Sequence, residues 1–294
     1  MLQSASATFT PAFQALVPSV LPEERDYTRA LSLSRLAYDL EALVSPLLAV
    51  ALLAVVSYHQ LFVGTVLGFL ASAALVLSAR LPALDDAAPS PFLERLTRGV
   101  RLFAARRELR VLAGLNLVVA AATGMVLVNT AVLVQVGLGR PQADVAVLLA
   151  AYGAGSMLVV LAVPRLLERL QDLPVMTVGA AALPVLLAAM AAAIAASAPW
   201  TLLLVLWLTT GAATSAVLTP SARVLARNAD EAQRPAVYAA QFSLSHACFL
   251  VSYPVAGLVG SAAGLPAAAL VLTGLGALGL AGALAAGRSA LSRA

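Results

Sequence analysis

One stretch of the sequence occurs twice in related form. It reads ALSLSRLAYDLEALVSPLLA at residues 30–49, and its first part is matched by QFSLSHAC at residues 241–248. The first copy places Arg35, Asp39 and Glu41 in an otherwise apolar run. Ionisable side chains inside an apolar membrane helix are costly and usually functional. The stretch therefore predicts a membrane protein that has internal symmetry and a charged site in one half.

Composition supports this interpretation. The chain of 294 residues is 61% hydrophobic and 11% charged, with a mean hydropathy of +0.94, whereas soluble domains carry about 25% charged residues. All 18 basic residues are arginines, and most lie between apolar runs. This is the pattern of topology determinants, so the net charge of +4 does not indicate a nucleic-acid partner. The single cysteine, Cys248, excludes an internal disulfide.

Apolar runs of the roughly 20 residues that span a bilayer follow one another along the chain. We expect an all-α polytopic membrane protein of about eight full transmembrane helices, preceded by a partial helix at residues 1–19. The full helices are predicted at residues 28–57, 59–80, 110–137, 142–167, 173–197, 199–227, 233–261 and 263–287.

The longest polar connection, residues 81–109, contains an amphipathic pattern over residues 91–110. Apolar side chains recur at helical spacing, and the arginines fall mostly on other faces. We interpret this segment as a helix on the membrane surface with its arginines near anionic headgroups. A helix that binds a regulatory partner is the alternative.

Arginine placement orients the chain. Links rich in arginine alternate with links that carry none or only Arg140. Since basic links stay on the cytoplasmic side, we expect a bacterial-type inner-membrane protein whose central loop and C-terminus are cytoplasmic.

The repeat continues on both sides of the opening stretch. TPAFQALV at residues 10–17 resembles TPSARVLA at residues 219–226, and Ser45-Pro46 corresponds to Tyr253-Pro254. Both copies run in the same direction, as in transporters built from two parallel six-helix halves. Three full helices precede the second copy after the central loop, but only nine residues precede the first. We therefore expect that about three helices are missing from the N-terminus.

With this topology, central loop and pair of helix-ending prolines, the chain resembles the major facilitator superfamily. The resemblance implies four parts: residues 1–80 as the remnant of an N-terminal half, 81–109 as the cytoplasmic central loop, 110–287 as the C-terminal six-helix half, and 288–294 as a cytoplasmic tail. Pro46 stands where drug antiporters of this family carry a proline–glycine motif. Pro254 and Gly257 belong to the corresponding run of the second copy, and we interpret all three as structural positions.

The proton or substrate pathway is predicted to include three charged residues of the first copy. Arg35 and Asp39 are four residues apart and can pair on one helix face, whereas Glu41 faces elsewhere. Asp39 or Glu41 is the predicted proton carrier. In the alternative interpretation, Arg35 and Asp39 form a structural pair and Glu41 fixes a neighbouring helix.

Four further polar residues complete the predicted pathway. His246 occupies the place of Arg35 in the second copy and could relay protons or simply pack against its own helix. Asn116, Asn129 and Gln241 could contact a substrate or form hydrogen bonds between helices.

The sequence contains no catalytic triad, metal-ligand cluster or phosphate loop, so we expect no enzyme activity, cofactor or metal. We predict a monomeric permease that exports a small organic solute by proton-coupled alternating access, with the lipid bilayer as its surroundings. The alternative is a transport-incompetent remnant, or a membrane sensor or assembly protein on the same fold.

Overall fold

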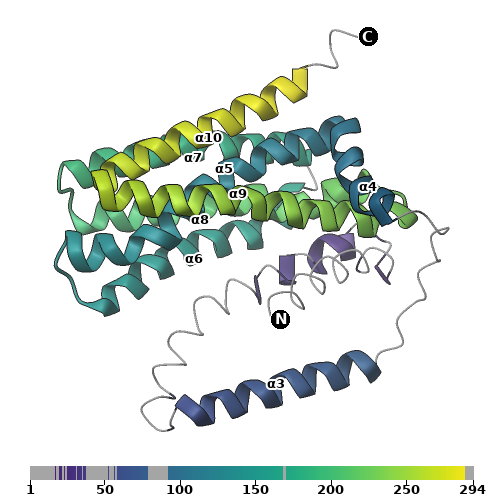
Figure 1. Ribbon diagram of the computed structural model, residues 1–294, viewed down its shortest axis with the longest axis horizontal. Coiled ribbons are helices and arrows are strands. Elements are labelled where there is room, and N and C mark those ends of the chain that lie inside the picture. The colour runs from purple at the N-terminus through teal and green to yellow at the C-terminus, as the bar shows by residue number, and fades with distance from the viewer. Residues whose placement is uncertain are drawn as a thin grey trace.

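The computed structural model contains a bundle of six long helices with smaller elements at its edge (Figure 1). It describes residues 17, 20, 21, 23, 25–30, 32–34, 36, 37, 52, 56, 58–78, 92–167 and 170–288. The bundle consists of α5 (Arg107–Val132, extended by a π-helical turn at Leu133–Gly137), α6 (Gln142–Leu167), α7 (Asp172–Ala195), α8 (Trp200–Arg227), α9 (Arg234–Ala263) and α10 (Leu265–Arg288). The prediction of an all-α membrane bundle is confirmed, and each of the six helices overlaps a predicted span.

Helix α5 is the central element of the bundle. It packs against α7, α8, α9 and α10. Of the residues in its most apolar 18-residue stretch, 72% are buried. Its buried side chains include Leu115, Val118, Met125 and Val126. Because this helix is apolar around its whole circumference, it suits the middle of a bundle, with the other helices between it and lipid.

Glycines bring neighbouring helices together at two crossings. A Cβ atom added to Gly155 of α6 or Gly211 of α8 would lie well under 3.0 Å from a backbone oxygen of the other helix. At the α5–α10 crossing, a Cβ added to Gly114 would lie 2.7 Å from the carbonyl oxygen of Gly279. Small residues let membrane helices approach closely enough for backbone packing, and these glycines do so here.

The bundle has two chemically different ends. Helices α5, α7 and α9 begin at the end that carries Arg106, Arg223 and Arg227, which we call the basic end. At the opposite end, Arg140 pairs with Asp144 at 2.7 Å and its guanidinium lies 4.3 Å from the ring centre of Trp200.

In the described part of the chain, α3 and α4 lie outside the six-helix bundle. Helix α3 (Tyr58–Ser78) matches the span predicted at residues 59–80 and lies apart from the bundle in Figure 1. Helix α4 (Phe92–Ala105) corresponds to the amphipathic segment and packs against α9, with Phe103 buried and Gly99 close to the backbone of Ala236.

The predicted length of the amphipathic helix is wrong. A single helix over residues 91–110 is expected, but Arg106 adopts an extended conformation (φ −97°, ψ 127°) that separates α4 from α5. The Arg106 guanidinium donates hydrogen bonds to the Asn228 carbonyl and, at 2.9 Å, to Gln233 Oε1. This anchoring to the α8–α9 link turns the chain where the local sequence favours a continuous helix.

Candidate functional site

Four of the predicted pathway residues lie at the interface of α5 and α9 or on α9 beside it. Asn116 of α5 and Gln241 of α9 face each other and exchange two hydrogen bonds, 3.0 Å from Asn116 Nδ2 to Gln241 Oε1 and 2.9 Å in the reverse direction. Asn116 is almost fully buried and Gln241 half-buried. Each amide thus satisfies the other in an apolar setting, where a lone amide would be costly.

The second α5 asparagine makes a similar connection further along the same interface. Asn129 Nδ2 donates to the Ala256 carbonyl of α9 at 3.2 Å, and Gly260 lies close to its Oδ1. The next residue, Thr130, accepts a hydrogen bond from the fully buried indole of Trp207 in α8 at 2.9 Å. Helices α8, α5 and α9 are therefore linked in series by polar contacts.

The predicted structural positions Pro254 and Gly257 both lie within α9. A Cβ added to Gly257 would be 3.6 Å from Val128 of α5, which is ordinary van der Waals contact. Ser252, one turn before, is buried with its backbone next to Gly124 of α5. Gly257 and Ser252 thus lie where α9 crosses α5, whereas the Pro254 side chain is exposed, and the role of Pro254 and Gly257 remains a prediction.

His246 lies on α9 with an exposed side chain between two aromatic residues. Its ring stacks on Phe242 with 3.9 Å between centroids and meets Phe249 edge-on at 5.7 Å. Its Nδ1 lies 2.8 Å from the Phe242 carbonyl oxygen. Since a carbonyl oxygen only accepts, Nδ1 carries the hydrogen, and Nε2 is the acceptor of the neutral ring.

The remaining predicted residues, Arg35, Asp39, Glu41 and Pro46, lie outside the described residues. Their roles remain predictions from the sequence alone.

An ion-pair cluster at the basic end was missed by the sequence analysis. Asp172, in the first turn of α7, has a side chain that is 1% exposed and lies against Arg223 and Arg227 of α8. Arg227 donates a hydrogen bond to Oδ2, whereas Arg223 Nε lies 3.2 Å from Oδ1 without hydrogen-bond alignment. Glu108 of α5 joins through Arg227 at 3.5 Å. The available signal was an acidic residue that opens a helix directly after a basic link, the one with Arg165 and Arg169.

The same end contains contacts between segments far apart in the sequence. The Tyr27 hydroxyl lies 2.9 Å from that of Tyr238 and donates to the Ala222 carbonyl at 3.0 Å. Arg223 donates to the Thr28 hydroxyl at 2.7 Å. Burial and the neighbouring Tyr238 raise the pKa of Tyr27 far above its ordinary value, so it stays neutral and hydrogen-bonded.

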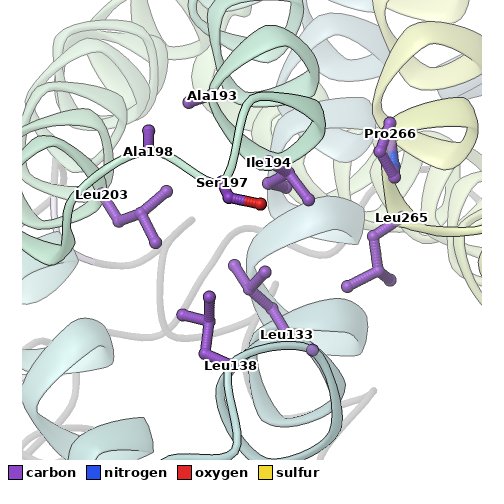
Figure 2. Close-up of a pocket in the computed structure, with 10 residues that line it drawn as sticks. Leu133, Leu138, Ala193, Ile194, Ser197, Ala198, Leu203, Leu265 and Pro266 are labelled. Carbon is purple, nitrogen blue, oxygen red and sulfur yellow. The ribbon is translucent and has the colours of Figure 1, made fainter.

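A small recess of about 280 Å³ opens at the opposite end of the bundle (Figure 2). It lies where the ends of α5, α7 and α10 meet, and aliphatic side chains such as Leu133, Ile194 and Leu265 line it. Ser197 supplies the one hydroxyl among its lining residues. The recess thus offers little that could orient a polar solute. Within the described ranges, no group of three or more potential metal ligands is found.

The family model described as Major Facilitator Superfamily matches residues 1–194. The chain belongs to the major facilitator superfamily. The predicted resemblance is confirmed, and transmembrane transport is the function of the family.

A solved structure of another superfamily member shares the fold. The crystal structure of the transporter FucP in the outward conformation has a TM-score of 0.59 and 18% sequence identity, over 90% of this chain and 69% of that one. A search of curated proteins found no match. At this level of identity the similarity establishes the fold, and it carries no information about the solute.

Membership of the superfamily gives the α5–α9 interface a functional context. Transporters of this architecture hold their solutes between helices near the middle of the membrane. The three predicted polar residues at this interface, Asn116, Asn129 and Gln241, lie within helices long enough to span the membrane. They interact chiefly with each other and with backbone, so they also serve as packing contacts.

Proposed function

We propose that this protein exports a small organic solute by alternating access, with proton movement as the driving force. The observation that carries the proposal is the series of amide and imidazole side chains on α5 and α9, within a predominantly apolar bundle. Polar groups at membrane depth are expensive and are commonly retained along solute or proton pathways. We further propose that the basic end and the C-terminus face the cytoplasm, because arginine-rich links remain there.

The proposed proton carriers are His246, Asp39 and Glu41. His246 has an exposed side chain, and its Nε2 accepts no hydrogen bond from any described residue, so this nitrogen is open to a proton. The two acids are proposed from the sequence alone, because carboxylates in an apolar run are the usual proton-relay groups.

Reconstitution tests the proposal. The purified chain in liposomes containing a pH-sensitive dye should dissipate an imposed proton gradient when an exported solute from a chemically diverse panel is added. His246→Gln or Asp39→Asn should reduce this coupled flux by at least tenfold, whereas Asp144→Asn, which changes an acid of a surface pair, should leave it unchanged.

A folded, monodisperse protein that moves no panel member with or without a gradient would contradict the proposal. It would favour the alternative of a sensor or assembly protein that uses the superfamily fold without transport. Unchanged flux in the His246 and Asp39 variants would support the transport proposal but refute these residues as proton carriers.

A further inference from the structure

We propose that an aromatic strip on α9 binds the flat face of a planar aromatic solute, whose edge donates a hydrogen bond to His246 Nε2. The strip consists of Phe242, His246, Phe249 and Tyr253. This inference rests on the proposed transport function and names the chemical class of its solute.

The four rings form one continuous surface. Their sequence spacings of four, three and four residues place them on a single edge of the helix. Neighbouring ring centroids are separated by 3.9 Å, 5.7 Å and 5.3 Å along the strip. These separations are close to those of interacting aromatic pairs, so the rings hold one another in place and present a pre-formed ladder.

The strip is accessible and also anchored. It lies between the buried face of α9, which includes Ser252 and Ala256, and the exposed aliphatic face, which includes Leu250 and Leu258. At its far end, the residue before Tyr253 is the buried Ser252, whose backbone lies next to Gly124 of α5. A solute lying on the strip would therefore contact a surface fixed to the central helix of the bundle.

His246 gives the strip a chemical preference. Its Nδ1–H donates to the Phe242 carbonyl oxygen, and its Nε2 makes no hydrogen bond to any described residue. An exposed acceptor at membrane depth is costly unless a donor meets it. A planar molecule with an N–H or O–H on its edge satisfies the acceptor and the rings together.

Lipid chains are a poorer match for this strip. An acyl chain has no donor for Nε2 and gains no ring stacking, and the adjoining aliphatic face, with Leu250 77% and Leu258 69% exposed, already suits it. The chemistry of the strip thus favours an aromatic solute, and lipid occupancy becomes an outcome of the test.

Fluorescence titration of the purified full chain with proflavine, a planar dye with ring-edge amines, tests the inference. Phe249→Leu removes one ring at nearly constant volume, and His246→Phe keeps the stack but removes the acceptor. Each should weaken proflavine binding about fivefold to tenfold. The matched control is Phe69→Leu, which removes an exposed ring on α3 and should not change binding. Dicyclohexylamine, an amine without a flat ring, should not displace the dye.

The outcomes separate the two proposals. Equal affinity of Phe249→Leu, His246→Phe and wild type, or displacement by dicyclohexylamine, would refute the aromatic site and point to lipid-like coverage of the strip. If proflavine binding is weakened by both substitutions but neither proflavine nor any panel solute is transported into or out of vesicles, the aromatic site is supported and the transport proposal is refuted. Transport of panel solutes that is indifferent to both substitutions would keep the transport function and refute the aromatic site.

Discussion

Replacing Asp172 with asparagine should destabilise the protein more than any other change of a single described acid. The substitution keeps the size of the side chain but leaves Arg223 and Arg227 without their shared carboxylate. Removing one partner of a fully buried pair costs about 3–5 kcal/mol. Here the Asp172 side chain is 1% exposed, but those of Arg223 and Arg227 are 13% and 46% exposed. Water can therefore solvate the two guanidinium groups in the variant, which lowers the cost.

We therefore expect a loss of about 2–3 kcal/mol, which corresponds to a fall in Tm of roughly 3–5 °C for a chain of this size. The measurement is thermal unfolding in detergent at one fixed scan rate, followed by the fluorescence of Trp200 and Trp207, both of which lie in α8. Asp144→Asn is the matched control, because its helical pair with Arg140 is partly exposed and contributes about 0.3–0.5 kcal/mol.

The reasoning would be refuted by equal shifts in the two variants. That result would mean that the cluster at the basic end contributes no more to the free energy of unfolding than a surface ion pair does. A large shift in Asp172→Asn that is matched by Asp172→Leu would also contradict it, because an asparagine that retains polar contacts should be the milder change.

Three further predictions use the same unfolding measurement. Gly211→Ala should lower the free energy of unfolding by about 1–3 kcal/mol, because the added methyl group would collide with the α6 backbone. Gly153→Ala, whose methyl group meets open space, should be neutral, and equal effects of the two substitutions would refute the close-packing argument. In a double-mutant cycle, Asn116→Leu and Gln241→Leu should show a coupling of about 0.6–1.7 kcal/mol, and additive losses would show that the paired amides do not support each other. Tyr27→Phe should lose about 1 kcal/mol with its buried hydroxyl contacts, and an unchanged Tm would indicate that they contribute nothing.

The helices of the bundle could be predicted because each apolar run exceeds the length of a membrane span and is bounded by polar or helix-breaking residues. The break at Arg106 could not, because residues 92–110 contain no proline and keep a helical pattern across it. The turn depends on hydrogen bonds from Arg106 to the α8–α9 link, and such tertiary contacts have no local signature.

The candidate site was predictable in its residues but not in its pairings. Amides in apolar helices stand out in a sequence, so Asn116, Asn129 and Gln241 could be selected. That Asn116 meets Gln241, whereas Asn129 meets a backbone carbonyl, follows from the packing of α5 on α9.

The charge cluster was missed for a different reason. Arg223 and Arg227 were assigned wholly to topology, although an arginine at a helix end can orient the chain and also neutralise a buried acid. A basic link that adjoins an acidic helix start, as at Asp172, is the pattern that would have indicated both roles.

The two ends of the bundle differ in how easily they can separate, and this bears on the proposed mechanism. At the basic end, Tyr27 and Thr28 are joined to α8 and α9 by hydrogen bonds, beside ion pairs to a buried carboxylate. Water can replace such bonds one by one as a gap opens, because each net contribution is small. At the opposite end, aliphatic side chains line the recess, and separating them exposes apolar surface with no substitute contact from water. If access alternates as proposed, we expect the polar basic end to carry the reversible contacts, and variants of Tyr27 or Thr28 to shift the open-to-closed equilibrium more than variants of recess residues such as Ile194.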